Sequence, residues 1–98
     1  MFQLKYLPDA VTDRATIETY LSQYYKGTAK KFFDLLKKKT SRLKEFPYSC
    51  SVYTDDPDYR RLVVGEYLVF YIVNEEYRTI EIHRIFHGTQ DIKRFLKS

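Results

Sequence analysis

The stretch that decides the fold is YRRLVVGEYLVFYIVNEEYRTIEIHRIFHGTQD, which runs from Tyr59 to Asp91. It holds three apolar, β-branched or aromatic runs, separated by the short turns Gly65-Glu66 and Asn74-Glu75-Glu76. Such runs, joined by turns this short, predict consecutive antiparallel strands. We expect these strands at Arg61–Val64, Tyr67–Val73 and Thr79–Phe86.

The second and third runs differ in pattern. Tyr67–Val73 has no charged residue on either face, so we expect it in the middle of the sheet with both faces covered. In the third run Ile80, Ile82 and Phe86 share one parity, as in a half-buried strand. Arg84 falls on the same parity and breaks the alternation near the end of the strand, so it is the first residue that suggests a role other than packing.

The rest of the chain predicts a helical hairpin framed by strands. A strand at Phe2–Leu7 is stopped by Pro8, and a helix then runs from Pro8-Asp9 to Gly27 with an apolar face that includes Ile17, Tyr20, Leu21 and Tyr24. A second helix spans Ala29 to Leu43 or Lys44, followed by a strand at Tyr48–Tyr53 and a short C-terminal helix carrying Ile92, Phe95 and Leu96. The predicted fold is α+β: a small twisted, mainly antiparallel sheet with an N-terminal helical hairpin on one face and a short C-terminal helix.

Length and composition limit the class of protein. Ninety-eight residues with 44% hydrophobic content are enough for one domain, residues 1–98, with a single core. The single Cys excludes an internal disulfide and is consistent with a cytoplasmic location. No apolar run is long enough to span a membrane, and we expect no membrane partner. The net charge of +4 suits a nucleic-acid, ribosomal or acidic protein partner.

Most cofactor chemistry is not indicated by the sequence. His83 and His87 have a helical metal spacing, but they fall on a predicted strand and its exit, where residues four apart are too distant to share a metal. There is no nucleophile elbow, phosphate-binding glycine loop or dinucleotide fingerprint. We expect neither a metal nor a cofactor.

A basic cluster at the strand ends is the main candidate site. Arg60 and Arg61 begin one predicted strand, Arg84 and His87 end another, and Asp91 follows. Two guanidinium groups beside an imidazole can hold an RNA phosphate and move a proton. The alternative is structural, with Arg84 paired to Asp91 or to a loop acid such as Asp56 or Asp58. A second basic surface, on the Ala29–Lys44 helix, includes Lys37 and Lys38 and is either a contact surface or simply solvated.

Several segments together resemble the RelE/ParE superfamily of toxins from bacterial type II toxin–antitoxin systems. The segments are Tyr6-Leu7-Pro8-Asp9-Ala10, Ile17 with Tyr20-Leu21, Ala29-x-x-Phe32, Leu43-x-x-Phe46-Pro47, Arg60 to Tyr67 with Phe70-Tyr71, and Ile80-x-Ile82-x-Arg84-Ile85-x-His87-Gly88 with Asp91. The resemblance runs nearly end to end. It implies a toxin that arrests growth and is neutralised by a cognate antitoxin with an acidic toxin-binding segment.

The resemblance leaves the cellular target open. RelE-like members cut mRNA in the ribosomal A site, whereas ParE-like members poison DNA gyrase. Leu68 stands where many RelE-like nucleases carry a phosphate-binding Arg, and Arg84-x-x-His87-x-x-x-Asp91 is similar to the ParE-like ending. An endoribonuclease would use Arg61, Arg84 and His87 catalytically, and contacts to either target would come from Arg60, Lys37, Lys38, Gln90 and Asp91. The remaining alternative is a non-toxic relative or a basic RNA-binding module without catalysis.

Overall fold

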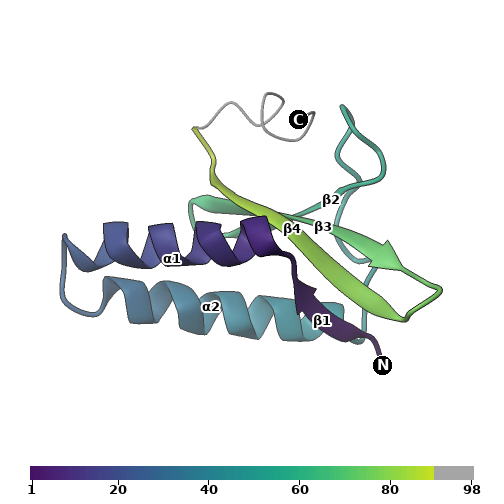
Figure 1. Cartoon of the computed structure of the whole chain (residues 1–98), viewed down its shortest axis with the longest axis horizontal. Coiled ribbons are helices and arrows are strands. Elements are labelled where there is room, and N and C mark those ends of the chain that lie inside the picture. Colours follow the sequence, from purple (N-terminus) through teal and green to yellow (C-terminus); the bar gives the residue numbers. More distant parts are fainter. Residues whose placement is uncertain (90–98) are drawn as a thin grey trace.

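The structure is a computed structural model of the chain, and it describes residues 1–89. Its elements are β1 (Gln3–Tyr6), α1 (Pro8–Ser22), α2 (Thr28–Leu43), β2 (Arg60–Val64), β3 (Tyr67–Asn74) and β4 (Thr79–His87). The four strands form one sheet in the order β1-β4-β3-β2. β1 runs parallel to β4, whereas β3 is antiparallel to both β2 and β4. The two helices lie side by side on one face of the sheet (Figure 1), which confirms the predicted α+β fold and helical hairpin.

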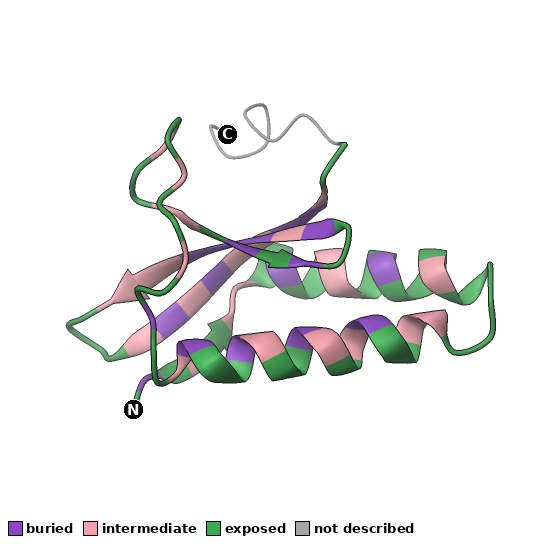
Figure 2. Ribbon diagram, turned by 180° about the vertical axis from the view of Figure 1, so that it is seen from behind, coloured by how far each residue is buried: buried purple, intermediate pink, exposed green. Residues whose placement is uncertain are grey.

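The core lies between the helices and the two central strands. Val69 and Tyr71 of β3 and Ile80 and Ile82 of β4 are fully buried. The helices contribute a further row of apolar side chains to this core, comprising Ala10, Ile17, Phe32, Leu36 and Leu43. Figure 2 shows this burial along the central strands and along the inner sides of both helices. The central position predicted for Tyr67–Val73 is confirmed, because β3 has a strand on each side.

The opposite face of the sheet is covered in part by the connection between α2 and β2. Phe70 is fully buried on this side, where its ring contacts Tyr53 at 5.2 Å and Phe86 at 5.8 Å. Figure 1 shows the connection on the side of the sheet away from the helices. We call this side the open face.

The first helix ends earlier than its sequence pattern predicts. α1 stops at Ser22, and Gly27, with φ of +86°, precedes α2. The positive φ suits glycine, because a Cβ would be strained there. Tyr20 and Tyr24 were predicted to belong to the apolar face of the first helix, and they are 51% and 59% exposed. The reason is that the hairpin projects past the end of the sheet (Figure 1), so the sheet does not reach these rings.

A β-bulge in β4 changes which face each of its later residues occupies. Phe70 pairs with Arg84 and Tyr71 with Ile82, so His83 is the extra residue between them. Beyond the bulge, Ile85 faces the helices, whereas Arg84 and Phe86 lie on the open face. The predicted single apolar face of Ile80, Ile82 and Phe86 is therefore wrong at Phe86.

The strand predicted at Tyr48–Tyr53 is wrong. This segment makes only an isolated bridge, between Val52 and Arg60. Tyr48 and Val52 are exposed, so the segment offers no apolar row that a strand could bury. The Arg60 guanidinium instead holds the segment by donating to the Cys50 carbonyl at 2.7 Å.

The predicted C-terminal helix, Gln90 and Asp91 lie outside the described residues. Within residues 1–89, neither helix has the length and apolar character needed to cross a membrane.

Candidate functional site

The three residues predicted to form a catalytic group fall on two different faces of the sheet. Arg61, Phe70 and Arg84 occupy one row across β2, β3 and β4, because Phe70 pairs with both arginines. The side chains of both arginines therefore leave the sheet on the open face, one on each side of Phe70. His87 pairs with Tyr67, which packs against Phe32 of α2 with ring centroids 4.9 Å apart. His87 thus lies on the helix face.

Arg84 is held by an acid on the first helix. Its Nε donates to Asp13 Oδ2 at 2.8 Å, and its Nη2 donates to Asp13 Oδ1 at 3.0 Å. The ion pair and hydrogen bonds raise the pKa of Arg84, with hydrogen bonding to Asp13 the largest cause. Its guanidinium also lies over the Phe86 ring, 4.6 Å from the centroid. The partner described for Arg84 is Asp13 and not the loop acids Asp56 or Asp58, whereas Asp91, the other predicted partner, lies outside the described residues.

Arg60 and Arg61 take different roles although they are neighbours. Arg60 donates to the Cys50 carbonyl and lies over the Tyr48 ring at 4.9 Å, so it supports the α2–β2 connection. Arg61 is exposed on the open face. Of the two predicted lysines on α2, Lys37 lines a groove beside β1, whereas Lys38 is exposed outside that groove.

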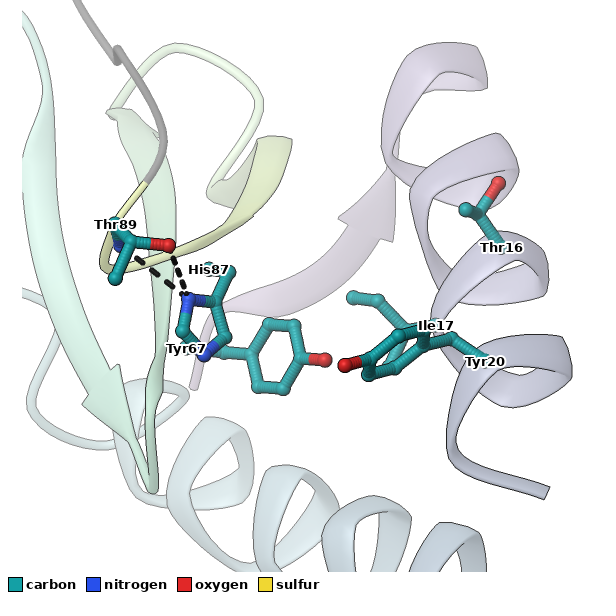
Figure 3. Close-up of a pocket in the computed structure, with 6 residues that line it drawn as sticks. All are labelled: Thr16, Ile17, Tyr20, Tyr67, His87 and Thr89. Carbon is teal, nitrogen blue, oxygen red and sulfur yellow. Dashed lines mark hydrogen bonds between the residues drawn. The ribbon is translucent and has the colours of Figure 1, made fainter. Parts of the chain in front are cut away.

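His87 helps to line a pocket at the end of the sheet. The pocket has a volume of about 330 Å³ and is lined by Thr16, Ile17, Tyr20, Tyr67, His87 and Thr89. In Figure 3 the hydroxyl groups of Tyr20 and Tyr67 point toward one another from opposite walls. We call this the tyrosine pocket. Sequence periodicity did not indicate it, because it depends on the hairpin projecting past the sheet.

The tautomer of His87 follows from its hydrogen bonds. The backbone N–H of Thr89 donates to Nδ1 at 3.3 Å, and the Thr89 hydroxyl lies 2.8 Å from the same atom. Since a backbone N–H is only a donor, Nδ1 is the acceptor, and the neutral ring carries its proton on Nε2. Nε2 lies 3.7 Å from Glu66 Oε2, so the imidazole has a carboxylate beside it.

A groove between β1 and the two helices is the second concave region. It has a volume of about 410 Å³, and its lining includes Leu4 and Tyr6 of β1, Arg14 of α1, and Phe33, Lys37 and Lys44 at α2 and its end. A smaller hollow of about 240 Å³ shares Arg14 and Phe33 with it. We call the two together the β1 groove.

Arg14 lies between two rings at the centre of the β1 groove. Its guanidinium carbon is 4.6 Å from the Tyr6 centroid and 5.5 Å from the Phe33 centroid. Its Nε is buried and has no hydrogen-bond partner among residues 1–89, so a donor there is unused. Burial is the largest cause of the raised pKa of Tyr6, which Arg14 partly offsets. Nothing in the spacing of Arg14 marked it as a site residue.

The metal-binding pattern of the two histidines does not become a metal site. His83 contacts the Tyr59 ring at 5.2 Å, whereas His87 contacts Tyr67 on the other face of the sheet. Within residues 1–89 there is no group of three or more His, Cys, Asp or Glu side chains able to hold a metal ion.

Comparison with known structures identifies the fold. The chain is similar to the isolated E. coli RelE toxin, with a TM-score of 0.66, 15% identity and coverage of 99% of this chain and 97% of that one. It is similar to a chain of the intact E. coli RelBE toxin–antitoxin complex, with a TM-score of 0.65, 15% identity and coverage of 92% and 100%. A chain of the chromosomal ParDE system from P. aeruginosa gives a TM-score of 0.63, 17% identity and coverage of 89% and 96%. At these identities the likeness establishes the fold alone.

The family is established by a sequence comparison. No curated protein sequence matches the chain. A family model, described as the ParE toxin of the type II toxin–antitoxin system parDE, matches residues 4–92. The match covers nearly the whole chain, so this protein belongs to the ParE toxin family and is a toxin component of a type II toxin–antitoxin system.

Proposed function

We propose that this toxin arrests growth in the bacterial cytoplasm by binding DNA gyrase, without cleaving RNA, and that a cognate antitoxin neutralises it. The observation that carries the choice of target is that Arg84 and His87 leave β4 on different faces, with Arg84 held by Asp13. Acid–base cleavage of RNA needs a proton-transfer group and phosphate-binding cations within hydrogen-bond reach of one substrate group. Here the register directs His87 to the helix face and Arg61 and Arg84 to the open face, and the Arg84 guanidinium is already held by Asp13 of α1.

The state of Arg84 supports the same choice. A guanidinium that already forms two hydrogen bonds with Asp13 would have to exchange a charged partner for a phosphate. That exchange is costly for a side chain that is only 23% exposed. The neighbouring row on the open face is apolar, because Leu68 pairs with Val63 and Phe86. The open face is therefore poorly suited to capture of a phosphate.

The projecting end of the helical hairpin supports a protein-binding role. Tyr20, Tyr24 and Tyr25 are 51%, 59% and 77% exposed there. Tyrosine is enriched in protein interfaces because its ring gives a large contact area and its hydroxyl still forms hydrogen bonds. Three exposed tyrosines at one protruding end suit contact with a protein.

The outer edge of β1 is a candidate site for the antitoxin. Within residues 1–89, β1 has a strand on one side only. Gln3 and Leu7 donate their N–H groups toward β4, to the carbonyls of Arg78 and Ile82. Because successive residues of a strand alternate in direction, Leu4 and Tyr6 direct their backbone groups to the outer edge. An extended partner segment could pair there as an added strand.

The charge of the β1 groove indicates the chemistry of that segment. Arg14, Lys37 and Lys44 line it. Of the two acids in the lining, Asp34 is already paired with Lys30 at 2.7 Å, and Glu18 lies in the smaller hollow. An acidic segment with apolar side chains would meet the cations, the rings of Tyr6 and Phe33, and the strand edge together.

The target is tested in two parallel assays, one with purified toxin and one in cells. We expect inhibition of DNA supercoiling by gyrase, relieved by added antitoxin, and no new transcript 5′ ends after induction in cells. Arg61→Ala is the informative variant, because Arg61 is exposed and its loss leaves the core intact. The variant should remain toxic. A-site cuts in transcripts, abolished by Arg61→Ala, would contradict the proposal and favour an endoribonuclease.

The antitoxin surface is tested with matched charge reversals on α2. Lys37→Glu with Lys44→Glu alters the β1 groove, whereas Lys31→Glu with Lys38→Glu places the same charges at exposed positions outside it. We expect the first pair to weaken binding of the cognate antitoxin by about tenfold or more, or ~1.4 kcal/mol, and the second pair to have little effect. Equal weakening by both pairs would show only a general effect of net charge.

A further inference from the structure

We propose that the tyrosine pocket is the toxin's contact site for its protein target, and that it takes an aromatic side chain of the target that lies next to a basic residue. This inference rests on the proposed function in that the target is a protein. It adds which surface of the toxin engages the target and what chemistry that surface recognises.

The size and shape of the pocket suit one ring. A cavity of about 150 Å³ is enough for benzene, and the tyrosine pocket has about 330 Å³. Its base is apolar, because Ile17 is 6% exposed and Tyr67 is 8% exposed. The rings of Tyr20 and Tyr67 approach from opposite walls (Figure 3). An inserted ring would contact both, in the tilted or edge arrangements that aromatic groups prefer.

The rings of the pocket are already ordered by contacts within the toxin. Tyr20 packs against Tyr24 with centroids 4.8 Å apart. His87 meets the Tyr67 ring edge-on at 5.2 Å and 90°, and its Nδ1 is bonded to Thr89. Side chains fixed before binding lose little conformational entropy when a partner arrives. A preformed aromatic pocket is therefore suited to anchor one partner side chain.

The hydroxyl groups of the pocket remain protonated at neutral pH. Hydrogen bonding to Tyr24 is the main cause that raises the pKa of Tyr20. Burial, followed by the charge of Glu66, raises the pKa of Tyr67. Both phenols are consequently neutral groups that donate and accept hydrogen bonds, and they suit a ring with a polar edge, such as that of Tyr or Trp.

The charge at the mouth of the pocket distinguishes its occupant from nucleic acid and from the acidic antitoxin. Among residues 1–89, no Lys or Arg lines the pocket. Glu66 is 87% exposed, and its carboxylate lies 3.7 Å from His87 Nε2. A carboxylate at the mouth repels phosphates and acidic peptides and attracts a basic neighbour of the inserted ring. The β1 groove has the opposite charge, so the two concave regions suit different partners.

Tyr20→Ala tests the proposal, with Tyr25→Ala as its matched control. Both residues are exposed at the same end of the hairpin, but only Tyr20 lines the pocket. We expect Tyr20→Ala to raise the concentration needed for half inhibition of gyrase by about tenfold or more, as for a central interface residue. Tyr25→Ala should inhibit like the unaltered toxin. Both variants should bind the antitoxin with unchanged affinity.

Thr16→Trp provides a test that keeps both tyrosines. Thr16 is exposed on α1 and lines the pocket, so an indole there fills the space without removing a core residue. Glu66→Lys reverses the charge at the mouth. We expect both changes to weaken gyrase inhibition while the antitoxin affinity and the urea midpoint stay unchanged. Normal inhibition by Tyr20→Ala and Thr16→Trp, or an equal loss of antitoxin binding, would overturn the inference.

Failure of the proposed function can be told apart from failure of this inference. If the unaltered toxin does not inhibit gyrase, the choice of gyrase is wrong, but the pocket is still tested by growth arrest on induction in cells. Tyr20→Ala and Thr16→Trp should then lose growth arrest while Tyr25→Ala retains it. Equal growth arrest by the unaltered toxin and these three variants would show that the pocket does not engage the target.

Discussion

Arg84 and Asp13 form a two-point ion pair that joins the bulged strand β4 to helix α1. The two hydrogen bonds measure 2.8 and 3.0 Å, and Asp13 Oδ2 also accepts the backbone N–H of Ile85 at 2.9 Å. β1 ends at Tyr6, opposite Ile82, so within residues 1–89 the later part of β4 has no strand on that side. The Asp13 carboxylate therefore accepts the Ile85 N–H in place of a carbonyl from a neighbouring strand. Arg84 neutralises the charge of that carboxylate.

Asp13→Ala should destabilise the fold strongly. The two side chains are only 14% and 23% exposed, and removal of one partner leaves a largely buried guanidinium and an unpaired N–H. We expect a loss of about 3 kcal/mol in the free energy of unfolding, measured by urea denaturation. Glu18→Ala, an exposed acid on the same helix, is the matched control and should change little. Asp13→Leu with Arg84→Met should recover part of the loss, and equal midpoints for Asp13→Ala and Glu18→Ala would contradict the structural role of the pair.

The sequence predicted those parts of the molecule that depend on local pattern. The uncharged run Tyr67–Val73 and the turn at Gly65-Glu66 located the sheet centre, because patterning and turn chemistry act over a few residues. The bulge at His83 was not predicted, and it reverses the faces of Arg84 and Phe86. A single extra residue changes the apolar pattern of a strand very little. It nevertheless decides which candidate residues lie on the same face of the sheet.

The candidate site was harder to predict than the fold. The spacing of Arg61, Arg84 and His87 indicated that strand ends approach one another, but it carried no information on which face each side chain takes. Asp13 lies 71 residues before its partner Arg84, and no local pattern links them. Arg14, whose Nε is buried in the β1 groove, could not be predicted from sequence periodicity either. Its surroundings come from three separate elements, β1, α1 and α2.

Tyr71→Phe should remove one buried hydrogen bond without altering the packing. The Tyr71 hydroxyl donates to the Pro47 carbonyl at 3.0 Å, and the residue is fully buried. Burial raises the pKa of this phenol, so it remains a donor over the physiological range. We expect a loss of about 1–2 kcal/mol in the free energy of unfolding, since the carbonyl is left unsatisfied. Tyr77→Phe, at a ring that is 71% exposed, should leave the urea midpoint unchanged, and a similar result for Tyr71→Phe would argue against the bond.

Arg60→Ala should loosen the connection between α2 and β2 before it affects the sheet. The guanidinium donates to the Cys50 carbonyl and covers the Tyr48 ring, so its loss removes two contacts that hold residues 48–53. We expect faster amide hydrogen exchange across residues 48–53 and a loss of about 1 kcal/mol in global stability. Arg61→Ala, at the next position but exposed, is the control. Unchanged exchange in residues 48–53 of Arg60→Ala would show that the segment is held in another way.

The partly buried imidazole at the bulge should make stability depend on pH. His83 Nε2 is buried, has no hydrogen-bond partner within residues 1–89 and lies 3.7 Å from Glu81 Oε1, while Tyr59 contacts the ring. Burial lowers the pKa of His83, and Glu81 only partly offsets this. The unfolded chain, with an imidazole pKa near ~6.5, therefore binds the proton more readily than the folded chain. The contribution of His83 to the free energy of unfolding is therefore fully present above the pKa of the unfolded imidazole. It is lost as the pH falls below that pKa.

His83→Phe isolates this contribution, because the ring contact with Tyr59 is kept while the titrating nitrogen is removed. Urea midpoints should be measured in steps from pH 8 to pH 5, a window above the ordinary pKa values of Asp and Glu, which are roughly 4. We expect the midpoint of the unaltered protein to fall across this window and that of His83→Phe to fall less. Parallel curves for the two proteins would show that the folded chain accommodates a charged imidazole at the bulge.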